Sequence, residues 1–66
     1  MYKKYLVVVY AFDIGYDDNL DYTRKRDAIS QARRLLRDYE STAVLDMESR
    51  NIVATYNNFP TEGINF

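Results

Sequence analysis

The sequence predicts an α+β fold: a small antiparallel sheet of three or four strands, in the order β-(β)-α-β-β, with one helix packed on one face. Residues 23–39 have the apolar spacing of an amphipathic helix, and the segments on both sides of it have the patterns of strands. The chain has 66 residues, which leaves room for one hydrophobic core. We therefore expect a single domain, residues 1–66, in which residues 57–66 form an irregular C-terminal tail.

The predicted helix runs from Thr23 to Tyr39 and contains neither glycine nor proline. Thr23 is the expected N-cap, because its hydroxyl can accept a hydrogen bond from a free N–H of the first turn. Apolar residues recur in steps of three and four, which places them on one side of a helix. This side, which we expect to face the core, consists of Ala28, Ile29, Ala32, Leu35, Leu36 and Tyr39.

The opposite side of this helix is basic, and Arg24 and Lys25 add two more cations at its start. Cations in a first turn oppose the helix dipole by about 0.3–1 kcal/mol each. Local helix stability therefore does not explain them, and we interpret this side as a partner-binding surface. We call it the basic helix face, and its members are Arg26, Ser30, Arg33, Arg34 and Arg37.

The segment Tyr5–Phe12 is predicted to be a strand that is apolar on both faces. One face has Tyr5, Val7, Val9 and Ala11, and the other has Leu6, Val8, Tyr10 and Phe12. One helix covers only one face of a small sheet, so the other must meet a second copy of the chain, the C-terminal tail or a binding partner. Because a small domain without cysteine has little buried area and no disulfide, we expect a homodimer through this second face.

The next segment, Asp13–Asn19, is predicted to be a loop or wide turn, because it combines Gly15 with a cluster of Asp and Asn residues. Leu20–Tyr22 is predicted to be a short strand that returns to the first one. The tail contains the only proline and the second glycine, and three apolar residues are its expected anchors: Phe59, Ile64 and Phe66.

Two strands, Ser41–Met47 and Ile52–Asn57, are predicted after the helix from their alternating apolar and polar residues. Residues 48–51 join them as a hairpin turn. We expect Asn51 to adopt a positive φ there, because Asn tolerates that conformation better than any residue except Gly.

The composition argues against catalysis, because the chain has neither histidine nor cysteine. Asp17, Asn19 and Asp21 match the first three ligands of a calcium-binding loop. However, Tyr22 stands where that loop needs Gly, and Ala28 where it needs a bidentate Glu. We therefore expect a solvated turn at this place, with no catalytic residue, no cofactor and no metal.

The N-terminal apolar run follows two lysines, as in a secretion signal, but it lacks a small-residue cleavage site. No apolar stretch approaches the roughly 20 residues that a membrane-spanning helix needs. We therefore expect a soluble, cytoplasmic protein.

Three interpretations of the basic helix face stay open: a solvated surface that pairs with the acidic loop, a binding surface for an acidic protein, and a binding surface for nucleic acid. The formal net charge of −1 argues against nucleic acid. Exposed tyrosines near the arginines would favour an interaction surface. Of the seven tyrosines, we expect Tyr5, Tyr10, Tyr39 and Tyr56 at the core or its edge, and Tyr2, Tyr16 and Tyr22 in flanks and loops.

The segment Tyr22–Ala28, followed by Ala32, Leu35 and Leu36 and by a hairpin that ends in Ile52 and Val53, resembles small proteins of phages and mobile elements. This resemblance implies action by binding rather than catalysis, in some cases as an inhibitor of host defence such as an anti-CRISPR protein. It carries over no functional residue. We therefore expect a non-enzymatic, macromolecule-binding inhibitor or adaptor that acts by protein–protein interaction. The alternative is a small nucleic-acid-binding regulator that uses the basic helix face.

Overall fold

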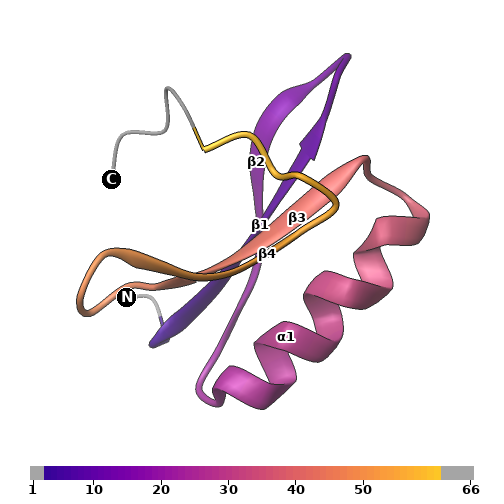
Figure 1. Ribbon diagram of the computed structural model, residues 1–66. Helices are drawn as coiled ribbons and strands as arrows, with labels where there is room; N and C mark the ends of the chain where they lie inside the picture. Colours follow the sequence, from indigo (N-terminus) through magenta and orange to yellow (C-terminus); the bar gives the residue numbers. More distant parts are fainter. Residues whose placement is uncertain (1–2, 62–66) are drawn as a thin grey trace.

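The computed structural model describes residues 3–61, which form a four-stranded antiparallel sheet with one helix packed against it (Figure 1). The strand order is β2-β1-β3-β4, so β1 and β3 are central and β2 and β4 are the edges. This architecture confirms the predicted fold class. The elements are β1 (Tyr5–Ala11), β2 (Gly15–Tyr22), α1 (Lys25–Arg34), the 3-10 helix η1 (Leu35–Arg37), β3 (Ser41–Asp46) and β4 (Asn51–Tyr56).

The core between α1 and the sheet is built from small and branched side chains. Val7 of β1 and Val44 of β3 are buried against Ala28 and Ala32 of α1. The two alanines let the helix lie close to the sheet, and the buried hydroxyl of Thr42 donates a hydrogen bond of 2.7 Å to the Ala32 carbonyl. Four of the six residues predicted on the apolar side of the helix, Ala28, Ile29, Ala32 and Leu35, thus belong to this core, whereas Leu36 and Tyr39 follow α1 and are only half-buried.

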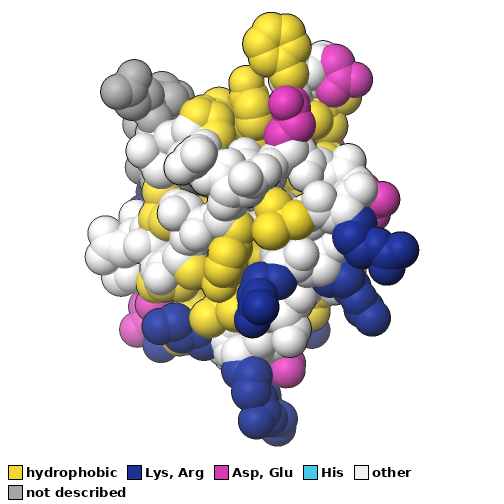
Figure 2. Space-filling view, turned by 45° about the vertical axis from the view of Figure 1, so that its right-hand side comes forward, with side chains coloured by type: hydrophobic (Ala, Val, Ile, Leu, Met, Phe, Trp, Pro, Cys, Tyr) yellow, Lys and Arg dark blue, Asp and Glu magenta, His cyan; other side chains and the backbone are white. Residues whose placement is uncertain are grey.

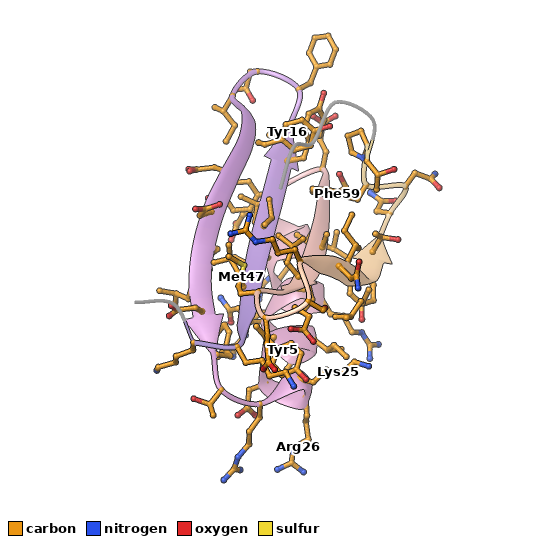
Figure 3. The ribbon with its side chains drawn as sticks, turned by 90° about the vertical axis from the view of Figure 1, so that its left-hand side faces the viewer. Tyr5, Tyr16, Lys25, Arg26, Met47 and Phe59 are labelled. Atoms are coloured by element: carbon orange, nitrogen blue, oxygen red, sulfur yellow. The ribbon has the colours of Figure 1, made fainter. Side chains whose placement is uncertain are left out.

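The second sheet face, which is the one away from α1, has its own apolar cluster. Leu6, Val8, Ala43 and Leu45 are buried there, and Phe59 of the tail packs on them with 6% of its surface exposed. Phe59 lies in front of the sheet and α1 behind it in Figure 3. The sequence allowed a second copy, the tail or a binding partner on this face, and the structure shows that the tail packs there. Two predicted anchors, Ile64 and Phe66, lie outside the described residues.

The tail reaches the second sheet face through a sharp change of direction after β4. Asn57 and Asn58 have φ values of 61° and 58°, a conformation that Asn tolerates. The Asn57 side-chain amide donates a hydrogen bond to the carbonyl of Glu40, whose carboxylate in turn accepts one from the N–H of Phe12. Glu40 thus ties the β1–β2 turn and the end of β4 to the start of β3.

The predicted loop at Asp13–Asn19 is wrong, because β2 begins at Gly15. The turn consists of residues 12–14 only, closed by a hydrogen bond of 3.2 Å from the Ile14 N–H to the Ala11 carbonyl, and Gly15 has a φ of 74°. Asp and Asn have low strand propensity, but pairing with the apolar strand β1 overrides it. Phe12, which was predicted to end the first strand, lies in this turn with 85% of its surface exposed.

The pairing of β2 with β1 contains a bulge. Leu6 pairs with Asp21 and Val8 with Asp18, so β2 advances by three residues where β1 advances by two. The would-be calcium ligands Asp17, Asn19 and Asp21 therefore lie in a strand, not in a loop. Within residues 3–61, no group of three or more acidic side chains could hold a metal ion.

The predicted helix Thr23–Tyr39 is too long at both ends. Arg24, not Thr23, is the N-cap residue, and it makes no side-chain cap hydrogen bond. The first helical bond runs from the Ala28 N–H to the Arg24 carbonyl at 3.2 Å. After Arg34 the chain tightens into η1, and no helix within residues 3–61 has the length and the apolar character needed to cross a membrane.

The predicted strands Ser41–Met47 and Ile52–Asn57 agree with β3 and β4 to within one residue at each end. The residue with positive φ in their turn is Arg50, at 61°, and not Asn51, which begins β4. The position is set by Asp46, whose carbonyl accepts a hydrogen bond of 2.7 Å from the Arg50 N–H. The Asp46 carboxylate also accepts bonds from the next turn residues, the N–H groups of Glu48 and Ser49, at 3.0 and 3.3 Å.

Candidate functional site

The basic helix face lies entirely in solvent: all five of its members, Arg26, Ser30, Arg33, Arg34 and Arg37, are exposed. Arg26 projects from the first turn of α1 beyond the lower end of the molecule in the view of Figure 3. Arg33 and Arg34 lie in the last turn of α1, and Arg37 ends η1. The predicted residues therefore share the outer side of the helix but are spread along its whole length.

The positive charge does not form one continuous patch. In Figure 2, Lys and Arg side chains lie in the lower and right-hand parts of the view as separate groups, with hydrophobic side chains between them. Acidic side chains lie beside hydrophobic ones at the top of the same view. Other acidic side chains lie directly beside Lys and Arg at the right, at the lower left and at the bottom of the view, so charges of opposite sign are partly interspersed on this side of the molecule.

A shallow hollow of about 350 Å³ lies between the end of β2 and α1. Two members of the basic helix face line it, Ser30 and Arg34, together with Tyr22, Asp27 and Gln31. The pKa of Tyr22 is raised, chiefly because partial burial disfavours the charged phenolate, although the Arg34 cation acts in the opposite direction. The Tyr22 hydroxyl is therefore a neutral hydrogen-bonding group at physiological pH, beside one cation and one anion.

A second candidate surface, which the sequence did not indicate, lies at the β1–β2 turn and along β2. Phe12 is 85% exposed, Leu20 58%, Ile14 54% and Tyr16 41%. Aspartates are interspersed among them, so the sequence reads as a polar loop. Only Tyr16 and Leu20 lie in β2 itself, and their exposure becomes predictable only when residues 15–22 are recognised as an edge strand, in which each side chain has a defined direction.

The predicted places of the tyrosines are confirmed in part. Tyr5, Tyr10 and Tyr56 are half-buried and pack on the core, and Tyr39 is half-buried too. The prediction of Tyr16 and Tyr22 in flanks and loops is wrong, because both lie in β2. Tyr16 lies in β2, with its ring centroid 5.0 Å from that of Tyr10 and 5.6 Å from that of Phe59. Its hydroxyl donates a hydrogen bond of 2.6 Å to the carbonyl of Pro60. Tyr16 is thus held in place on the second sheet face, and Tyr2 lies outside the described residues.

Comparisons with protein-family models, with curated proteins and with solved structures found no match to this chain. The chain itself offers two surfaces suited to a partner: the basic helix face, and the acidic and apolar surface at the β1–β2 turn and β2.

Proposed function

We propose that this protein is a non-enzymatic binding domain that acts as an inhibitor or adaptor, and that its basic helix face contacts an acidic surface of a partner protein. The observation that carries the proposal is that all five members of this face are exposed, while the opposite side of the same helix packs on the sheet. Lys25 and Arg26 lie in the first turn, where positive charge disfavours the helix. Binding, rather than folding, accounts for charges in these positions.

A protein partner fits the surface better than nucleic acid does. A nucleic-acid surface depends on dense positive charge, whereas the cations here are separate groups in a chain with a net charge of −1. The hydrophobic side chains that lie between these cations in Figure 2 also suit a protein interface. One observation favours the alternative of a nucleic-acid-binding regulator: Tyr22 and Arg34 line the same hollow, and both residue types stack on bases.

The role as an inhibitor or adaptor, with cytoplasmic location, belongs to the same proposal. A small domain without a catalytic group can affect another protein only by occupying its surface or by joining it to something else. The genomic neighbourhood of the reading frame tests this part. Phage or defence genes beside it would support an inhibitor, and genes of an unrelated process would contradict it.

The decisive experiment reverses two charges on the basic helix face. Arg33→Glu combined with Arg37→Glu should leave the fold nearly intact, since each exposed charge contributes about 0–1 kcal/mol to stability. The variant should lose binding to a protein captured by the parent chain by about tenfold or more, through lost attraction and new repulsion. Isothermal titration with the purified partner measures the loss.

The matched control is Lys3→Glu combined with Lys4→Glu, which changes the net charge equally at two exposed residues outside the helix. The control should keep nearly full affinity. If both double variants bind as tightly as the parent chain, the basic helix face is only a solvated surface. If instead the parent chain shifts random duplex DNA, and this shift weakens steeply with salt, the nucleic-acid alternative is correct.

A further inference from the structure

The outer edge of β2 presents main-chain groups that no other strand of residues 3–61 covers. β2 is the first strand in the order β2-β1-β3-β4, and β1 is its one neighbour. The N–H and C=O groups that point away from β1 can therefore pair with an added strand. The stretch Gly15–Asp18 is the regular part, because it pairs residue by residue with β1 before the bulge.

Proteins commonly protect such an edge with charges and bulges, and β2 has both. Protection does not explain the apolar side chains, however. Leu20 of β2 exposes 58% of its surface and Tyr16 exposes 41%, and Phe12 and Ile14 are exposed in the turn that leads into this strand. A strand that only had to avoid other chains would be polar at these positions, so the edge is suited to a partner.

The charge of this region specifies that partner. From Tyr5 to Thr23 the chain contains four aspartates and neither lysine nor arginine. Asp17 pairs with Val9 and Asp18 with Val8, so their side chains lie on opposite faces of the sheet. A second copy that paired β2 with β2 would bring aspartates close to aspartates, which is unfavourable. A segment with a cation on each face would instead place one positive charge beside Asp17 and the other beside Asp18.

Tyr16 adds a fixed apolar contact between these charges and the turn. Its ring contacts Tyr10 and Phe59, and its hydroxyl is bonded to Pro60, so it needs little further ordering when a partner arrives. A side chain that packs beside Tyr16 from an added strand would lie on the second sheet face.

We propose that Gly15–Asp18 of β2 binds an extended basic segment of another protein as a fifth strand of the sheet. The segment has lysine or arginine opposite Asp17 and Asp18 and an apolar residue opposite Tyr16. This surface is separate from the basic helix face, so the chain can hold an acidic surface on one side and a basic strand on another.

The probe is a short synthetic peptide with the central sequence Lys-Lys-Val-Thr-Val, titrated into the folded chain and followed by two-dimensional NMR of the backbone amides. We expect the largest shifts at residues 15–18 and none of comparable size in β4. Asp17→Lys combined with Asp18→Lys should weaken binding by about tenfold or more and should enable binding of the Glu-Glu counterpart of the peptide. Asp38→Lys combined with Glu48→Lys changes the net charge equally away from β2 and should have little effect.

Two peptides methylated at alternate backbone nitrogens separate strand addition from simple charge attraction. The peptide methylated on the nitrogens that face β2 should not bind, and the other should bind normally. The proposal would be overturned if the two methylated peptides bound equally, if the largest amide shifts occurred in α1, or if the unmethylated peptide did not bind at millimolar concentration. Shifts of the amides of residues 15–18 that appear when the parent chain alone is concentrated would assign the edge to a second copy instead. The Arg33 and Arg37 variant should bind the peptide normally, so failure here and failure of the proposed function are distinguishable.

Discussion

At the scale of single residues, the two tight turns of the sheet depend on one backbone conformation each. Gly15 has a φ of 74° where β2 begins, and Arg50 has a φ of 61° where β4 begins. Glycine adopts this conformation freely, whereas it costs other L-residues about 1–2 kcal/mol. Arg50 is therefore a strained residue at a position that its turn requires.

Arg50→Gly should raise the melting temperature, because it removes the cost of the positive φ from the folded state. The greater flexibility of glycine in the unfolded chain offsets only about 0.4–1 kcal/mol of this gain. Arg50→Val should destabilise the protein by about 1 kcal/mol, because branched residues tolerate positive φ least. Thermal melts of both variants measure these changes. Asn51→Gly is the matched control in the adjacent strand residue, and stabilisation by this control but not by Arg50→Gly would contradict the assignment.

The prediction of Asn51 at this position shows the limit of residue preferences. Asn does tolerate positive φ, but hydrogen bonds to Asp46 set which residue of the turn adopts it, and residue preferences do not include these bonds. The basic helix face was predictable because its members recur at helical spacing. The exposure of Phe12 and Ile14 was not, because apolar residues are by default assigned to a core.

At the scale of the elements, the sequence predicted the strand pairing of the second half better than that of the first. β3 and β4 alternate clearly, whereas β2 contains Asp17, Asp18 and Asn19, which favour turns. The strand forms because β1 is central and its main-chain groups need partners on both sides. A sequence pattern describes each segment separately, so it does not show that β1 needs a hydrogen-bonded strand on each side.

The tail acts as an additional structural element, because Phe59 closes the apolar cluster on the second sheet face. Phe59→Ala should destabilise the protein by about 3 kcal/mol, since it leaves a cavity over Leu6, Val8 and Leu45. Phe12→Ala is the matched control, because that side chain is 85% exposed and its loss should change stability by less than about 0.5 kcal/mol. Denaturant unfolding of the two variants measures the difference, and equal losses would mean that Phe59 does not close the cluster.

At the scale of the whole molecule, the two faces of the sheet are closed to different degrees. The face under α1 is covered by the length of a helix, whereas on the second sheet face Tyr10, Met47 and Ile52 are half-buried around Phe59. A chain of 66 residues buries only about 60% of the surface that its unfolded form exposes. A second copy that covered these side chains would increase the buried apolar surface on the sheet face that the single chain covers least.

We therefore predict that the chain forms a homodimer through the second sheet face at micromolar concentration, as sedimentation equilibrium would show. Met47→Lys should dissociate this dimer, because it places a charge among apolar side chains on that face, where Figure 3 shows Met47. Ser30→Lys adds the same charge on the exposed side of α1 and should leave the dimer intact. A parent chain that sediments as a folded monomer would show that the tail alone stabilises this face, and Met47→Lys would then change only the stability of the monomer.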